Sequence, residues 1–257
     1  MLTVTIASLS GGQGKTTVAL ILGRLLAGRG YSTLLIDADP QHNLTDWAGL
    51  EVGETDPTLL EVIKKTISIE DGIYQIEGQK NLFLIPADNQ LDTAHDYLAG
   101  SGVGATLLKK RLESAKKNFR FCVIDSPPQR SQMALSAIGA SDFIVIPAQT
   151  HIKGYGSLTR TLDLIKICQE SGATEGEILG VLPFADRWFG GRRHPDSQKV
   201  IDAMEEEVGE LILPSIKDSE RYKQAINRLT TPGALGYPDL EYPFNILIEK
   251  LVAKVGD

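Results

Sequence analysis

The stretch Ser10-Gly11-Gly12-Gln13-Gly14-Lys15-Thr16-Thr17 decides the fold of this 257-residue chain. It lies between an apolar run typical of a strand, Leu2–Ala7, and a segment whose apolar residues recur with the spacing of one helix face. Glycines leave the backbone free to curl around an anion, and the start of a helix presents unpaired N–H groups to it. The pattern of strand, glycine-rich loop and helix therefore predicts a phosphate-binding loop.

The polar residues of this loop have separate expected roles in binding ATP. Lys15 brings a positive charge to the β and γ phosphates, and the Thr16 hydroxyl is a ligand for Mg²⁺. The usual spacing of such a loop begins with a glycine, but Leu9 stands at that position. A glycine-rich turn without a ligand is the alternative interpretation. The residues expected to contact the nucleotide are Gly11, Gly12, Gln13, Gly14, Lys15, Thr16 and Thr17.

Two acidic motifs follow later strand-like runs. Asp37-Ala38-Asp39-Pro40-Gln41 ends one of these runs, and Asp125 ends the run Phe121–Ile124. Ligands of a parallel sheet bind at the carboxyl ends of its strands, so both motifs are expected near the phosphate loop. We expect Asp125 to hold Mg²⁺ through a water molecule, and Asp39 to contribute to the metal site and to position the attacking water. Capping of turns or helices is the alternative role for such carboxylates.

Short apolar runs alternate with helix-like segments along the whole chain. This alternation predicts an α/β fold, a doubly wound and mainly parallel sheet flanked by helices, in one P-loop ATPase domain over residues 1–257. Several runs are apolar throughout, as expected for strands that are covered on both faces. The predicted strands are Leu2–Ala7, Thr33–Ile36, Leu82–Ile85, Phe121–Ile124, Phe143–Ile146, Ile178–Leu182 and Leu211–Leu213. The predicted helices include Ala105–Lys117, Met133–Gly139 and Ser197–Val208.

Composition and charge restrict the class of protein. Hydrophobic residues make up 42% of the chain and charged residues 23%, which is ordinary for a globular protein. No apolar run approaches the ~20 residues that span a bilayer, and no signal peptide is recognisable. Cys122 and Cys168 are far apart and fit core positions in a reducing compartment, so we expect a cytoplasmic location. The net charge of -7 argues against general electrostatic adhesion to nucleic acid or anionic lipid.

Three motifs in this order, Ser-Gly-Gly-Gln-Gly-Lys-Thr-Thr, Asp-Ala-Asp-Pro-Gln and Ile-Asp-Ser-Pro-Pro, resemble those of the ParA/MinD family of deviant Walker A ATPases. The resemblance covers most of the chain. It includes Leu213-Pro214-Ser215-Ile216, which is similar to a family segment beside the base, so Pro214 and Ile216 are expected there. The resemblance implies ATP hydrolysis in a face-to-face homodimer, stimulated by a partner adaptor protein. It also implies a role in positioning or segregating a cargo.

One position departs from the family pattern. The family carries a signature lysine before Gly-Gly, which reaches across the dimer to the phosphates of the other subunit, whereas this chain has the short and uncharged Ser10. The candidate replacement is Lys153, which follows the predicted strand Phe143–Ile146; an exposed loop lysine is the alternative. The substitution resembles the carboxysome-positioning branch of the family, although ATPases with other cargoes, including plasmid or chromosome partition ATPases, could share it.

Two surfaces compete as the target of the ATP-bound dimer. The first is non-specific nucleoid DNA, whose phosphates basic residues contact without base readout. The candidates are Arg187, Arg192, Arg193, Arg221, Lys223 and Arg228. The second is a membrane, as in MinD, bound by a C-terminal helix face with Phe244, Leu247, Ile248, Leu251, Val252 and Val255. Because membrane-surface helices are usually rich in Lys and Arg, we expect this helix to pack on the sheet instead.

Overall fold

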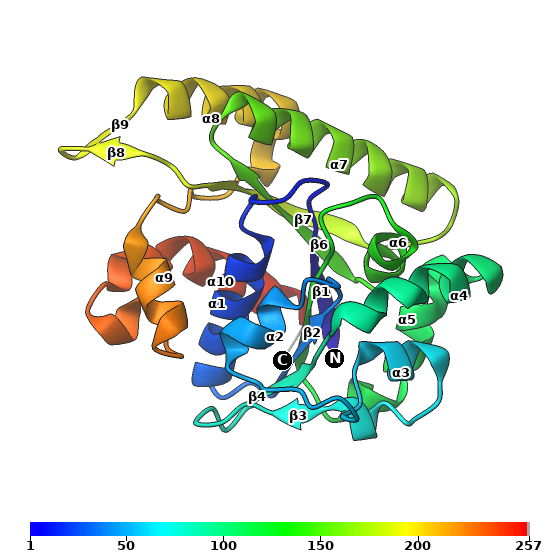
Figure 1. The fold of residues 1–257 in the computed structure, drawn as a ribbon. Helices are drawn as coiled ribbons and strands as arrows, with labels where there is room; N and C mark the ends of the chain where they lie inside the picture. Colours follow the sequence, from blue (N-terminus) through cyan, green and yellow to red (C-terminus); the bar gives the residue numbers. More distant parts are fainter. Residues whose placement is uncertain (256–257) are drawn as a thin grey trace.

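A seven-stranded sheet forms the centre of the computed structural model, which describes residues 1–255 (Figure 1). The strand order is β3-β4-β2-β5-β1-β6-β7, so β1 (Leu2–Ile6) lies between β5 (Phe121–Asp125) and β6 (Phe143–Gln149). Every neighbouring pair is parallel except β3 with β4. The fold is therefore the doubly wound, mainly parallel α/β fold that the sequence predicts.

The remaining elements surround this central part of the sheet. The other strands are β2 (Thr33–Asp37), β3 (Tyr74–Gln75), β4 (Leu82–Ile85), β7 (Glu177–Phe184), and β8 (Trp188–Phe189) paired with β9 (Arg192–Arg193) in a separate hairpin. The α-helices are α1 (Lys15–Gly28), α2 (Asn43–Ala48), α3 (Leu59–Lys64), α4 (Ala94–Gly100), α5 (Gly104–Leu112), α6 (Gln132–Gly139), α7 (Ile152–Glu170), α8 (Pro195–Val208), α9 (Glu220–Asn227) and α10 (Tyr242–Val255).

Helices cover both faces of the sheet, and alternate residues of one strand pack against different helices. Phe121 and Val123 of β5 belong to a hydrophobic cluster with α1 and α10. Cys122 and Ile124, the residues between and after them, belong to a cluster with α3, α4, α5 and α6. A third cluster packs α7 and α8 against β6 and β7. Burial on both faces explains why the strands are apolar throughout.

The C-terminal helix α10 packs against the protein, as the sequence predicts. Most of the predicted lipid face joins the cluster of α1 and β1 and is not free for lipid, and the side chain of Val255 lies outside the described part of the structure. The fully buried residues of this face are Phe244, Leu247, Ile248 and Leu251. Cys122 and Cys168 are buried free thiols, which confirms the prediction that they are core residues. Within residues 1–255, no helix has the length and apolar character needed to cross a bilayer.

The predicted strand Leu211–Leu213 is wrong. The segment forms only an isolated bridge to β7. A 3₁₀ turn, Gly209–Leu211, occupies its start, and Pro214 has no N–H with which to continue a ladder. The segment still runs along β7, since the Leu213 N–H donates to the Val181 carbonyl at 2.8 Å.

Candidate nucleotide site

The phosphate loop connects β1 to α1, and two glycines with positive φ shape its backbone. Gly12 has a φ of 76° and Gly14 a φ of 92°, a left-handed conformation that strains other residues. A Cβ on Gly14 would lie 2.5 Å from the ring of Phe184 at the end of β7. The side-chain oxygen of buried Gln13 accepts a hydrogen bond from the Gln149 N–H at 2.8 Å. The ends of β6 and β7 therefore hold the loop in its curled shape.

Lys15 begins α1 and has a largely buried side chain, 7% exposed. Its ammonium donates to the Ser10 carbonyl at 3.1 Å, so the side chain folds back across the loop. Burial lowers the pKa of Lys15, and the negative charges of Asp125 and Asp39 oppose this shift. The structure thus brings the ammonium and both carboxylates together at one edge of the sheet.

Asp125 ends β5 in register with Asp37 of β2 and Ile6 of β1. Burial, and then the negative charge of Asp37, raises the pKa of Asp125 to about 8, while a hydrogen bond with the Thr16 side chain opposes the shift. Among the described residues, the Oδ1 atom of Asp125 has no hydrogen-bond partner. A buried oxygen without a partner costs free energy, which a nearby cation or a metal-bound water relieves.

The two carboxylates of the first acidic motif have different surroundings. Fully buried Asp37 accepts hydrogen bonds from the Asp39 N–H at 3.2 Å and from both the N–H and the hydroxyl of Thr45 at 2.8 Å. Burial raises the pKa of Asp37 to about 6, and these hydrogen bonds oppose the shift. Asp39 accepts from the Gln41 N–H at 3.0 Å and borders a pocket. Asp37 therefore anchors α2, whereas Asp39, although only 9% exposed, lines the pocket that a ligand would enter.

A pocket of about 710 Å³ opens at this edge of the sheet, and its size suits a nucleotide. The phosphate loop and Asp39 border it on one side. Among the described residues that line it, neither Pro214 nor Ile216 occurs: Ile216 is fully buried in the core, and the residues that follow it border the pocket instead. The lining outside the loop includes Trp47, Phe184, Lys217, Ser219, Tyr222 and Ile226.

Part of this lining carries no sequence motif. Trp47, Phe184 and Tyr222 come from α2, the end of β7 and α9, which lie far apart in the chain. Aromatic and apolar side chains suit the flat face of a base. Only Phe184 has a sequence signal that could have found it, because it ends a strand of the parallel sheet, where ligands bind.

The donor set fits a nucleotide with Mg²⁺. The curled loop and the start of α1 offer backbone N–H groups to phosphates, and Lys15 adds a charge. The Thr16 hydroxyl and the unpartnered oxygen of Asp125 are hard oxygen ligands of the kind Mg²⁺ binds directly or through water. Asp39 lies beside them with a carboxylate that can hold a water molecule.

Lys153 lies in the first turn of α7, which starts directly after β6. Its side chain is exposed and does not line the nucleotide pocket. Within residues 1–255 no hydrogen bond or ion pair engages its ammonium. The Lys153 side chain is therefore available to a ligand outside the pocket of its own chain.

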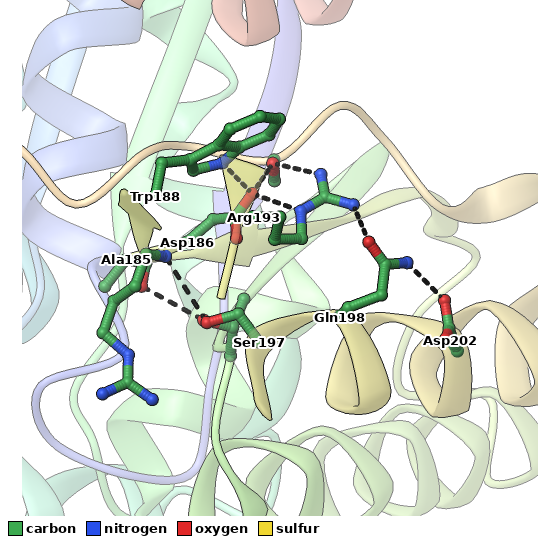
Figure 2. Close-up of polar contacts among 10 residues, drawn as sticks. Ala185, Asp186, Trp188, Arg193, Ser197, Gln198 and Asp202 are labelled. Carbon is green, nitrogen blue, oxygen red and sulfur yellow. Dashed lines mark hydrogen bonds and ion pairs between the residues drawn. The ribbon is translucent and has the colours of Figure 1, made fainter. Parts of the chain in front are cut away.

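Arg193, one of the candidate DNA contacts, is held inside the hairpin of β8 and β9. Its guanidinium donates to the carboxylate of buried Asp186 at 2.9 Å and to the Gln198 side chain at 2.9 Å (Figure 2). It also lies 5.2 Å from the centre of the Trp188 ring. The Arg193 guanidinium therefore orders the hairpin and is not free for a phosphate.

The other basic candidates differ in how far their side chains are occupied. Arg221 lies over the Tyr237 ring at 4.5 Å, and Lys223 forms a 2.9 Å ion pair with Glu220 and borders the nucleotide pocket. Three candidates are exposed, and no hydrogen bond or ion pair engages their guanidinium groups in the part of the chain that the structure describes. These are Arg187, Arg192 and Arg228.

The sequence matches known proteins over most of its length. A family model described as an AAA domain matches residues 1–175. Maintenance of carboxysome distribution protein A from Synechococcus elongatus is 52% identical over 252 residues, which cover 98% of this chain and 99% of the relative. The protein of the same name from Gloeothece citriformis is 50% identical and covers 99% and 98%. The sporulation initiation inhibitor protein Soj from Bacillus subtilis is 33% identical over 70% of each chain.

Solved structures agree with these relationships. Apo McdA from Cyanothece has a TM-score of 0.95 and 50% identity, covering 98% of this chain and 99% of that one. An aspartate-to-alanine variant of Cyanothece McdA in complex with ATP also has a TM-score of 0.95, at 50% identity and coverage of 98% and 96%. A putative plasmid partition protein from Borrelia burgdorferi, 22% identical with a TM-score of 0.78, shares the fold. This chain is therefore an ATPase of the ParA/MinD family, and within that family it belongs with the McdA proteins.

Proposed function

We propose that this protein forms an ATP-dependent sandwich homodimer, binds non-specific nucleoid DNA and positions carboxysomes in the cytoplasm. The observation that carries the proposal is the pocket lined by the phosphate loop and Asp39, in which Thr16 of the loop is hydrogen-bonded to the buried Asp125. The full-length similarity to carboxysome distribution proteins supports the cargo. An adaptor protein of the McdB or ParB kind stimulates hydrolysis in this proposal.

The residues of the pocket divide the work of hydrolysis. Lys15 exchanges the Ser10 carbonyl for the phosphates, since its ammonium is already within 3.1 Å of the loop. Thr16, and Asp125 through a water molecule, would hold Mg²⁺, which would supply positive charge to the phosphates. Asp39 positions the attacking water, because its carboxylate borders the pocket and Asp37 does not.

Across the dimer, Lys153 supplies the positive charge that Ser10 cannot supply. This proposal is supported by the exposed and unengaged side chain of Lys153 and by its place after β6, at the carboxyl edge of the sheet. A phosphate oxygen of the other subunit is a suitable ligand for such a free ammonium.

DNA binding relies in this proposal on the free cations rather than on Arg193. Arg187 and Arg192 lie on the hairpin that projects from the molecule (Figure 1), and Arg228 follows α9. Contacts of these side chains with phosphates are independent of base sequence and sensitive to salt.

Pull-downs with plasmid DNA and with anionic liposomes, each with ATP and with ADP, test whether the ATP-bound protein binds DNA or a membrane. We expect ATP-dependent capture by DNA and none by liposomes. The Arg187→Ala/Arg192→Ala variant should lower affinity equally for different DNA sequences and reduce the salt slope by about 2, roughly one per lost phosphate contact. Lys110→Ala, which removes an exposed lysine from α5, is the matched control.

Capture by liposomes in ATP, with no DNA binding, would contradict the nucleoid surface and favour the MinD-like alternative. Binding of DNA that is equal in ATP and ADP would contradict the nucleotide switch while leaving the ATPase assignment intact. A plasmid or chromosome partition ATPase would also bind DNA in this test. To exclude that function, the spacing of carboxysomes is measured in cells that lack the protein, and irregular spacing is expected.

A further inference from the structure

The start of the phosphate loop is held from outside the sheet by α7. The Ser8 hydroxyl lies 3.0 Å from the Ser157 hydroxyl, and both side chains are buried. The Leu9 N–H donates to the Thr161 hydroxyl at 3.1 Å. Three consecutive loop residues are contacted in this way, because Ser10 also has a partner on this helix.

That third partner is Arg160, whose guanidinium donates to the Ser10 hydroxyl at 3.3 Å. Positions 157, 160 and 161 share one helix face, since residues three and four apart are neighbours on a helix. We name Ser157, Arg160 and Thr161 the α7 clamp. Its members hold Ser8, Ser10 and Leu9 respectively.

Ser10 stands between two cations. Its carbonyl accepts from the Lys15 ammonium at 3.1 Å, and its hydroxyl accepts from Arg160. When Lys15 turns to the phosphates, the Ser10 carbonyl loses that partner, and among the hydrogen bonds of the described residues the one from Arg160 is left to hold Ser10. The Arg160 contact therefore matters most in the nucleotide-bound state.

We propose that Arg160 is a positioning residue for nucleotide binding, which acts through the Ser10 hydroxyl to fix the first half of the phosphate loop. Serine at this position is then a specific hydrogen-bond acceptor and not merely the absence of a longer side chain. The inference rests on the proposed use of Mg²⁺ and ATP at this loop. Arg160 does not line the pocket, so it needs no contact with the nucleotide.

A double-mutant cycle on the full chain tests the pair. We expect Arg160→Ala and Ser10→Ala each to weaken binding of a fluorescent ATP analogue with Mg²⁺ about fivefold, the effect of losing one hydrogen bond. The double variant should be no weaker than either single variant, because both remove the same contact. Arg160→Lys should recover part of the affinity that Arg160→Ala loses. In ATP hydrolysis, Arg160→Ala should raise the KM for ATP and leave kcat near the wild-type value.

The control is Lys166→Ala, which removes a positive charge from the same helix at a side chain that pairs only with Glu170 among the described residues, at 3.9 Å. Additive losses in the double variant, or an Arg160→Ala variant that binds as tightly as Lys166→Ala, would overturn the inference. If Arg160→Ala does not fold, Ser10→Ala alone tests the contact, and wild-type affinity of that variant would overturn the inference. Failure of the wild-type protein to bind the analogue would instead overturn the proposed function.

Discussion

At the scale of single residues, three carboxylates at one edge of the sheet differ in what surrounds them. Asp37 is saturated by hydrogen bonds from Thr45 and the Asp39 N–H. Asp125 is buried beside Thr16, with one oxygen unpartnered among the described residues. Asp39 is the one that borders two pockets. Their positions in the fold therefore separate a structural residue, a metal-site residue and a residue that faces water.

Asp39→Ala is expected to trap the protein with ATP bound. Loss of the carboxylate that positions water should lower the hydrolysis rate by at least about a hundredfold, while the phosphate loop stays intact. A stable ATP-bound dimer should then accumulate, as seen by light scattering coupled to size-exclusion chromatography.

The control for this variant is Asp46→Ala, which removes an exposed carboxylate of α2 that contacts only His42 within the described residues. It should hydrolyse ATP at the wild-type rate. An Asp39→Ala protein that stays monomeric with ATP, or that still hydrolyses it, would show that another group activates the water.

At the scale of elements, the hairpin of β8 and β9 is built around one buried carboxylate. Asp186 is fully buried, and its Oδ2 atom accepts from the Trp188 indole at 2.8 Å, the Arg193 guanidinium at 2.9 Å and the Ser215 hydroxyl at 2.5 Å (Figure 2). Trp188 and Arg193 are paired across the hairpin, so both point to Asp186. Phe189, on the opposite face, is 70% exposed.

Asp186→Ala should therefore lower the stability of the fold without acting directly on ATP hydrolysis. Three donors lose their acceptor in a buried place, and we expect a loss of about 2–3 kcal/mol in the free energy of unfolding. Urea denaturation followed by tryptophan fluorescence measures it as a lower midpoint. Asp202→Ala, which removes an acceptor for Gln198 at the surface, should leave the midpoint unchanged; an equal loss in both variants would contradict this account.

The sequence predicts long elements of this fold better than short ones. The core strands are continuous apolar runs, the long helices have apolar residues at helical spacing, and the phosphate loop is recognisable from its spacing. Two-residue strands such as β8 and β9 are too short to show alternation, and the predicted helix Ala105–Lys117 divides into α5 and a 3₁₀ turn, Ser114–Lys117. The base end of the pocket could not be predicted either, because α2, β7 and α9 meet there only after folding.

At the scale of the whole molecule, formation of the proposed dimer tests whether Lys153 supplies the positive charge that Ser10 lacks. Lys153→Ala should abolish the ATP-dependent dimer and leave a folded monomer that still binds ATP, since Lys153 lies outside its own pocket. Ser10→Lys in the same chain should restore the dimer by placing a cation where the family carries its signature lysine. Sedimentation velocity with ATP and with ADP measures both outcomes.

Lys199→Ala, which removes an exposed lysine from α8, is the matched control and should dimerise normally. Normal dimerisation of Lys153→Ala would remove Lys153 from the mechanism. Failure of Ser10→Lys to rescue, with circular dichroism unchanged, would show that the two positions do not serve the same phosphate.

The contact between α7 and the phosphate loop also has a mechanical consequence. The phosphate loop contacts Ser157, Arg160 and Thr161, which are the sixth, ninth and tenth of the 19 residues of α7. At ~1.5 Å per residue, Glu170 at the far end of the helix lies about 14 Å beyond Thr161. A tilt of the rigid helix by about 4° at the loop would therefore move that end by about 1 Å, so a movement of the loop would be transmitted along the helix.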